Sequence, residues 1–460
     1  MRKEKDSMGE VFVPDDAYYG AQTQRAAENF PISNRRIPRT LIKSLAMIKK
    51  SAAIVNHKLS RLNDEIKDAI VSACDEVIGG EHDSQFIVDI FQTGSGTSSN
   101  MNINEVLSNR ANEILGHELG DKFPVHPNDH VNLGQSSNDT FPSAINLSIS
   151  LDVDSNLLPA LNELLKSLNM KTEEFSNIIK IGRTHLQDAT PLTLGQEFSG
   201  YAQMIQNSIY KIEDSLKYIH YLAQGGTAVG TGINTHPDFG KMIAKELSKD
   251  SGISFNEAVN HFEAQSTQDS VLTTSSALRG LAVSLSKIAN DIRFLGSGPR
   301  AGIGELNIPA VQPGSSIMPG KVNPVICESL IQVCAQVIGN DQSVIQGAQG
   351  SYFELNVMMP MIASNILESI NILSTSIDMF NKKLIVDLEA NKEICNGYIE
   401  GSLAMCTSLV PAIGYDKAAE IAYKAYQQNK TVREIALNEN ILSKEEIDKL
   451  LNHENMIKSK

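Results

Sequence analysis

At about 150 residues per domain, the 460 residues of this chain suggest two to four domains. Hydrophobic residues make up 41% of it, enough to bury a sizeable core. The 54 acidic and 40 basic residues give a formal net charge of −14, which disfavours a nucleic-acid partner because the phosphate backbone binds basic surfaces. No apolar stretch approaches the roughly 18–20 residues that cross a bilayer, and residues 1–10 lack the apolar core of a secretory signal. We therefore expect a cytoplasmic protein with neither nucleic acid nor membrane as a partner.

The five cysteines are odd in number and include no C-x-x-C pair. This spacing argues against a disulfide framework, a zinc ribbon and an iron–sulfur cluster. We expect the cysteines to be small core residues, and the sequence predicts neither a metal site nor a cofactor.

Apolar residues recur three and four positions apart in several long stretches, which predicts helices. Alternation with a period of two is nearly absent, apart from a short strand or hairpin at residues 11–13. Long helices with little strand predict a mainly α protein built on an elongated bundle, and their broad apolar faces predict burial in another subunit. The predicted helices cover residues 41–59, 157–179, 201–222, 271–295 and 325–345.

Four polar segments interrupt the helical pattern. The first, residues 92–104, carries no charge and leads into a helix, and seven of the side chains from 92 to 100 are hydroxyls or amides. An ordinary capped turn needs only one such side chain. Hydroxyls and free backbone N–H groups at the start of a helix favour an anion-binding site.

The second segment combines residues 126–129 with residues 135–139. Ser136, Ser137 and Asn138 either cap the helix that follows or bind a carboxylate. Residues 126–129 read equally well as a plain turn.

The third segment, residues 182–191, places His185 among polar neighbours and ends at a proline. On local grounds this histidine is as consistent with a structural role as with a catalytic one.

The fourth segment, residues 298–324, holds five Gly and five Pro in 27 residues and resembles a closing lid. Asn323 reads as the N-cap of the next helix, with Pro324 at its first position. Lys321 and the positive end of that helix would then act on the same spot.

Together these segments supply what one chemistry requires. A small dicarboxylate needs several donors to hold two charges. Removal of a proton next to a carboxylate creates a dianionic enediolate, which fixed donors stabilise. The pattern therefore predicts proton abstraction with elimination and no cofactor.

Residues 314–324, GSSIMPGKVNP, resemble the signature of the fumarase/aspartase superfamily, and the resemblance extends over essentially the whole chain. Residues 19–25 and 414–416 fit it as well. Two features favour class II fumarase within the superfamily: His185 stands where aspartases typically carry Gln, and Gly320 where they typically carry Ala.

This resemblance implies a three-domain subunit with boundaries at 1–137, 138–392 and 393–460. A central bundle of five long helices would join three others in a twenty-helix tetramer core. Each active site would be built from three subunits. The implied reaction is the reversible hydration of fumarate to (S)-malate through an enediolate (aci-carboxylate) intermediate, a step of the citric acid cycle.

Two alternatives stay open at this point. An aspartate ammonia-lyase shares the fold and the enediolate. A non-catalytic scaffold could also keep the fold, although the complete set of reactive side chains argues against it.

The resemblance also assigns roles to individual residues. Ser315 would be the base at C3 of malate, with Lys321 stabilising its alkoxide. His185, oriented by Glu328, would handle the water or hydroxyl leaving group. The residues implied in substrate binding are Ser95, Gly96, Thr97, Ser136, Ser137, Asn138, Thr184, Ser316, Lys321, Val322 and Asn323.

A second, non-catalytic dicarboxylate site would comprise His126, Pro127, Asn128 and Asp129. Phe123 departs from the family pattern, because a basic residue often assists the second site at this place. This departure puts the affinity of the second site in question.

Overall fold

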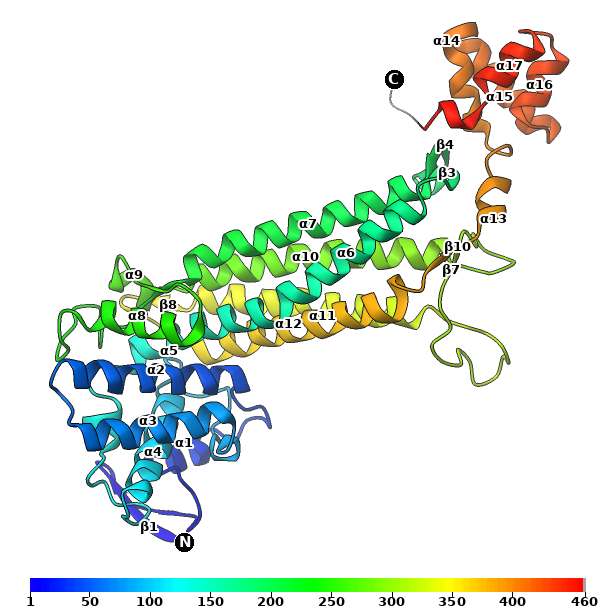
Figure 1. Ribbon diagram of the computed structural model, residues 1–460. Coiled ribbons are helices and arrows are strands. Elements are labelled where there is room, and N and C mark those ends of the chain that lie inside the picture. Colours follow the sequence, from blue (N-terminus) through cyan, green and yellow to red (C-terminus); the bar gives the residue numbers. More distant parts are fainter. Residues whose placement is uncertain (458–460) are drawn as a thin grey trace. The chain divides into compact units, whose positions relative to one another are not determined.

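The computed structural model describes residues 1–457 and is mainly helical, as the sequence predicts (Figure 1). All five predicted helices are present, and α12 is a further long helix that the periodicity analysis did not single out. In the described part of the chain, no helix has both the length and the hydropathy needed to span a membrane. The long helices are α2 (Arg39–Lys58), α6 (Leu158–Glu174), α7 (Leu194–Ile219), α10 (Asp269–Leu295), α11 (Val325–Ala348) and α12 (Met359–Phe380).

The chain forms two compact units that are each discontinuous in sequence. Unit 1 comprises residues 1–159, 209–282 and 334–374, and unit 2 comprises residues 160–208, 283–333 and the stretch from residue 375. The three-domain division at 1–137, 138–392 and 393–460 stays a prediction.

Unit 1 is organised around α2, whose apolar side chains lie in its core. Leu41, Leu45 and Ile48 are fully buried there. Helix α2 packs against α3 (Asp64–Gly79), α5 (Ser137–Asp152) and α8 (Phe239–Ser251). The three-to-four spacing of the sequence thus gives the face that fills the core. The other helices here are α1 (Ala21–Asn29), α4 (Thr97–Ile114) and α9 (His261–Ser266).

Short strands in unit 1 pair locally. Strands β1 (Arg2–Asp6) and β2 (Gly9–Val13) form an antiparallel hairpin, which confirms the hairpin predicted around residues 11–13. The remaining pairs are β5 (Tyr221–Leu222) with β6 (Asn256–Glu257), which is parallel, and β8 (Ser351–Tyr352) with β9 (Leu355–Asn356), which is antiparallel.

In unit 2 the third polar segment is a hairpin. Strand β3 (Ile179–Thr184) pairs antiparallel with β4 (Gln187–Thr193). The prediction of a helix up to residue 179 is therefore wrong at its end, because α6 stops at Glu174. Strand β7 (Leu306–Asn307) pairs with β10 (Glu389–Ala390) in the same unit.

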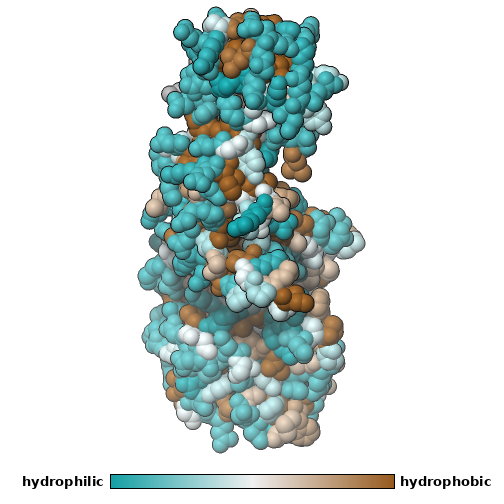
Figure 2. All heavy atoms as spheres, turned by 90° about the vertical axis from the view of Figure 1, so that its right-hand side faces the viewer, coloured by the Kyte–Doolittle hydropathy of each residue, from teal (hydrophilic) through white to brown (hydrophobic). Residues whose placement is uncertain are grey.

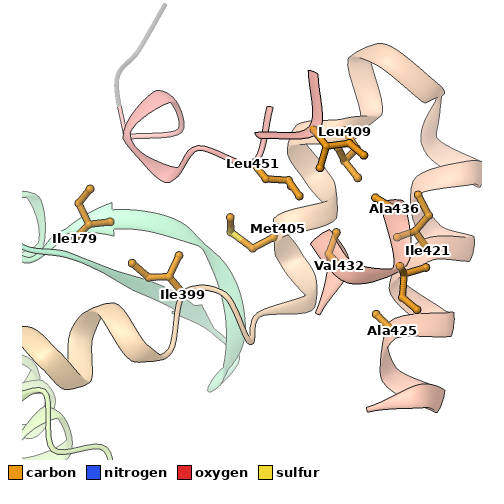
Figure 3. Packing of buried hydrophobic residues seen from close by; sticks show 11 residues of the cluster. Ile179, Ile399, Met405, Leu409, Ile421, Ala425, Val432, Ala436 and Leu451 are labelled. Carbon is orange, nitrogen blue, oxygen red and sulfur yellow. The ribbon is translucent and has the colours of Figure 1, made fainter. Parts of the chain in front are cut away.

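The C-terminal segment of unit 2 packs short helices around a small apolar core (Figure 3). The side chains of Met405, Leu409, Ile421 and Leu451 are almost completely buried in it. Ile179 of β3 belongs to the same cluster, so this core also contacts the hairpin. The helices of this segment are α13 (Lys392–Gly397), α14 (Val410–Ile413), α15 (Tyr415–Gln428), α16 (Val432–Asn438) and α17 (Lys444–Leu450).

Hydrophobic side chains also reach the surface, as the brown areas of Figure 2 show. Large apolar residues stand exposed on the long helices, among them Tyr210 and Tyr218 of α7 and Val283 and Phe294 of α10. Such faces favour burial in another subunit, which stays a prediction for this chain.

Candidate active site

The first and second polar segments meet at the starts of helices α4 and α5. The Thr97 hydroxyl is hydrogen-bonded to the Ser95 hydroxyl at 2.6 Å and to the Ser137 hydroxyl at 2.7 Å. Thr97 and Ser137 are the first residues of the two helices. A chain of hydroxyls thus joins two helix N-termini, where free N–H groups and the helix dipoles favour an anion.

Gly96 allows this close approach. Its φ of 73° is left-handed, and a Cβ placed on it would lie 2.2 Å from the ring of Phe141. Any larger residue would therefore separate α4 from α5. Packing alone therefore accounts for a glycine at this position, and its contact with substrate stays a prediction.

Ser136 caps helix α5. Its side chain accepts a hydrogen bond from the backbone N–H of Asn138, and Asp139 accepts one from the backbone N–H of Ser136 at 2.9 Å. The helix starts at Ser137, so the capping role suggested by the sequence is confirmed for Ser136. Capping by Ser136 leaves the Ser137 hydroxyl free to face the neighbouring helix end.

A cavity of about 360 Å³ opens beside these helix ends. We call it the α4–α5 pocket. It includes Thr97, Ser136 and Ser137 from the predicted binding set. The other residues lining it are Asn100, Met101, Asn132, Gly134, Gln135, Thr227, Ala228, Ile233 and Asn234.

Sequence reasoning missed the wall formed by residues 227–234. Four glycines stand among the eight residues from 225 to 232, a density that could have identified the segment. Thr227 has a φ of 56° and a buried hydroxyl that has no hydrogen-bond partner within the described residues. Asn138 reaches this wall, because its side-chain amide donates to the carbonyl of Ala228 at 2.8 Å.

His185 lies at the tip of the β3–β4 hairpin. Thr184 pairs with Gln187, so His185 and Leu186 are the two residues of the turn, with φ of 56° and 61°. Two left-handed residues are typical of a type I′ turn, which normally selects Asn or Gly. The hairpin therefore presents an exposed imidazole on a turn that its own residue types disfavour.

A buried ion network holds the base of this hairpin. Glu305 is fully buried and accepts two hydrogen bonds of 3.0 Å from the guanidinium of Arg183. The ammonium of Lys180 lies 3.2 Å from Glu305 and 2.8 Å from Glu197. These contacts fix β3 next to the His185–Leu186 turn.

Replacing Glu305 by Gln should destabilise unit 2 by about 3 kcal/mol, because it leaves buried cations without their main counter-charge. The expected result is a lower midpoint of thermal unfolding. Glu400 also pairs with an arginine, Arg433, but at the surface. A Glu400→Gln control should move the midpoint little, and equal shifts in the two variants would contradict the importance of burial.

The fourth segment forms a folded loop with a cavity of about 440 Å³ among residues 310–322. The Ser315 hydroxyl accepts backbone hydrogen bonds from Ile317 at 3.2 Å and Met318 at 2.9 Å. Two N–H groups aimed at this oxygen would stabilise negative charge on it. Lys321 lines the same cavity and is exposed.

The prediction that Asn323 caps helix α11 is wrong. The helix begins at Val325, so Pro324 and not Asn323 directly precedes it. The Asn323 side chain instead donates to the carbonyl of Gly314 at 2.5 Å and closes the neck of the loop. Its amide is committed to the loop, and the sequence pattern Asn-Pro could not distinguish the two uses.

Of the predicted catalytic groups, Ser315 and Lys321 line one cavity, and His185 and Glu328 do not line it. Among residues 1–457, no hydrogen bond or ion pair joins His185 to Glu328 or to Ser315. Glu328 lies in the first turn of α11 and is exposed. The roles of His185, Ser315, Glu328 and Lys321 stay predictions, as do those of Thr184, Ser316 and Val322.

The predicted second site forms a capped turn. His126 precedes the short helix Pro127–Val131, and its Nδ1 accepts the backbone N–H groups of Asn128 and Asp129 at 3.2 Å. His126 thus has a capping role in this segment, and ligand binding at residues 126–129 stays a prediction. His126 and Asn128 line a cavity of about 740 Å³ that also contains Lys3, Lys5 and Lys122.

The cysteines behave as the sequence predicts. All five are free thiols; Cys74, Cys327, Cys334 and Cys395 are buried and Cys406 is half-buried. Within the described residues, no group of three or more His, Cys, Asp or Glu side chains could hold a metal ion.

Comparison with known proteins places this architecture. Residues 9–339 match the family model described as Lyase, and residues 405–458 match the model described as Fumarase C C-terminus. The chain is 51% identical over 460 residues to the class II fumarate hydratase of Thermosynechococcus vestitus, covering 100% of this chain and 98% of the relative. It is 50% identical over 451 residues to that of Neisseria meningitidis serogroup A, covering 98% and 97%.

A solved structure agrees with these relatives. The crystal structure of class II fumarase from Schistosoma mansoni matches with a TM-score of 0.97 and 44% identity, over 99% of this chain and 98% of that chain. The fold and the Lyase match define a lyase of the fumarase/aspartase superfamily. The chain belongs to the class II fumarate hydratase family and is a hydro-lyase.

Proposed function

We propose that this enzyme adds water reversibly to fumarate to give (S)-malate, and that the α4–α5 pocket binds one end of the dicarboxylate. The pocket is proposed because a chain of hydroxyls, Ser95, Thr97 and Ser137, lies at two converging helix N-termini. Relatives about half identical over the full length carry it for the substrate. We also propose a cytoplasmic enzyme of the citric acid cycle.

In the direction from malate, Ser315 takes the proton from C3. The electron pair left behind enters the adjacent carboxylate and gives the enediolate. A serine hydroxyl is a weak base unless its alkoxide is stabilised, and the N–H groups of Ile317 and Met318 support that role. Lys321 adds a positive charge on the same loop.

Loss of the hydroxyl completes the reaction. His185 gives a proton to the C2 hydroxyl as the C–O bond breaks, and the enediolate electrons form the double bond of fumarate. The products are fumarate and water. Ser315 then loses its proton to solvent and His185 takes one up, which restores both groups. Glu328 would orient the imidazole from a neighbouring chain.

We further propose that the active site is shared among subunits of a homotetramer. Support comes from the exposed position of His185 on its turn and from the exposed apolar residues of α7 and α10. A shared site also explains why the polar segments are far apart in sequence.

Ultraviolet absorbance of fumarate tests the proposed function. The purified protein should produce fumarate from (S)-malate and much less from aspartate, and it should keep this activity in a chelator. Preference for aspartate would favour the ammonia-lyase alternative. Activity that chelator abolishes and iron restores would contradict the Ser315–His185 chemistry.

A further inference from the structure

A fully buried lysine lies behind the α4–α5 pocket. Lys49 of α2 is 0% exposed, and its ammonium donates to Oδ1 of Asn132 at 2.9 Å and to Oε1 of Gln135 at 3.1 Å. Both acceptors are neutral amides that line the pocket. Burial of an ammonium without an ion-paired carboxylate is costly, so a packing role alone would be served better by methionine.

The amide that Lys49 holds is a shared acceptor. Oδ1 of Asn132 also accepts the side-chain N–H groups of Asn100 and Asn104, each at 3.2 Å. The side-chain oxygens of Asn100 and Asn104 are buried without a partner in the described chain. Three donors converging on one oxygen leave Asn132 a single orientation, and Asn100 lines the pocket beside it.

A buried carboxylate holds the other wall. Asp139 of α5 is also 0% exposed and accepts backbone N–H groups from Ser136 at 2.9 Å, Gly225 at 3.3 Å and Thr227 at 2.8 Å. These bonds tie the start of α5 to the glycine-rich wall. With Asp139 occupied by backbone donors, the lysine and the carboxylate interact only through space.

We propose that Lys49 is a positioning residue for the dicarboxylate: its ammonium orients Asn132 and Gln135 and supplies a buried positive charge that favours a dianion in the α4–α5 pocket. This inference rests on the proposed function. It adds a positive charge that is not among the predicted binding residues: the Lys49 ammonium, which is one hydrogen bond behind the pocket wall.

The electrostatic environment of Lys49 supports this role. Burial lowers the pKa of Lys49 to about 7, while Asp139 of α5 and Cys74 of α3 act on it in the opposite direction. Burial raises the pKa of Asp139 to about 6. A dianion in the pocket stabilises the protonated amine, so dicarboxylate binding should take up a proton above about pH 7.

Lys49→Met tests the proposal, because methionine keeps the length and removes the charge. The KM for fumarate should rise about 10- to 100-fold, with kcat changed far less. Lys50→Met is the matched control. Lys50 follows Lys49 on α2, is ion-paired with Asp75 at 2.9 Å and does not line the pocket, so the KM of this variant should stay normal. A normal KM in active Lys49→Met would overturn the proposal.

Calorimetry of the wild-type enzyme provides a test that needs no variant to fold. Binding of succinate, a non-reacting dicarboxylate, should take up protons at pH 7.5–8.5, seen as a heat that depends on the ionisation enthalpy of the buffer. Lys49→Met should lose this uptake and Lys50→Met should keep it. Succinate binding without proton uptake in the wild type would overturn the inference, whereas a wild type that does not turn over fumarate would overturn the proposed function itself.

Discussion

Replacing His185 by Asn should lower kcat by about 10²–10⁴-fold, the usual worth of a general acid–base group. Asparagine tolerates the left-handed φ of 56° at this turn, so the hairpin should keep its shape. The imidazole is exposed, and its loss should cost little stability. Steady-state kinetics would measure the fall in kcat, and the mass of the assembled protein would show whether the variant still assembles.

A second histidine provides the control for this exchange. His453 lies in the short C-terminal helix His453–Asn455 and is not among the predicted site residues. His453→Asn should leave kcat unchanged. A normal kcat in His185→Asn would remove His185 from the mechanism, and a collapsed assembly would show that the turn has a structural role instead.

Mixing two inactive variants should restore activity if the site is shared. His185→Asn and Ser315→Ala each damage every site of their own tetramer. Suppose the two variants are unfolded together and reassembled, and a site takes His185 and Ser315 from different chains. The chance that the site receives a native His185 is then one half, and the chance that it receives a native Ser315 is independently one half. About a quarter of the sites should then be wholly native under unbiased, closed assembly.

The control is reassembly of each variant alone, which should give no recovery. Mixed tetramers verified by mass, yet no more active than the parents, would mean that both residues of a site come from one chain. That result would contradict the shared site and leave the reaction itself untouched.

The helical part of the fold could be predicted from the sequence because its signal is local. Leu41, Leu45 and Ile48 repeat at the helical period, and they fill the core of unit 1. The β3–β4 hairpin escaped prediction for a physical reason. The apolar–charged–apolar run Ile179, Lys180 and Ile181 covers only three residues before Gly182, too few to distinguish a strand from the end of the preceding helix.

The candidate site was predictable where hydroxyls and glycines cluster in sequence. Ser95, Thr97 and Ser137 come together at two helix starts. Lys49 could not be predicted, because a lysine beside Lys50 reads as part of a solvated helix face. Its burial depends on residues distant in sequence, because α2 packs against α5 and the Lys49 ammonium contacts Asn132 and Gln135. The predicted meeting of His185 with Ser315 would depend on an assembly, which the sequence of one chain does not specify.

At the His185–Leu186 turn, the predicted catalytic side chain stands on a backbone whose conformation is held by other residues. The backbone there is imposed by the Thr184–Gln187 pair and by the Arg183–Glu305 contact below it, and not by the preferences of the two turn residues. A side chain that tolerates the left-handed φ of 56° can therefore replace His185 without rebuilding the loop. Divergence between water and ammonia as leaving groups would then require little new architecture, and a search for altered chemistry in this scaffold should begin at the tip of the hairpin.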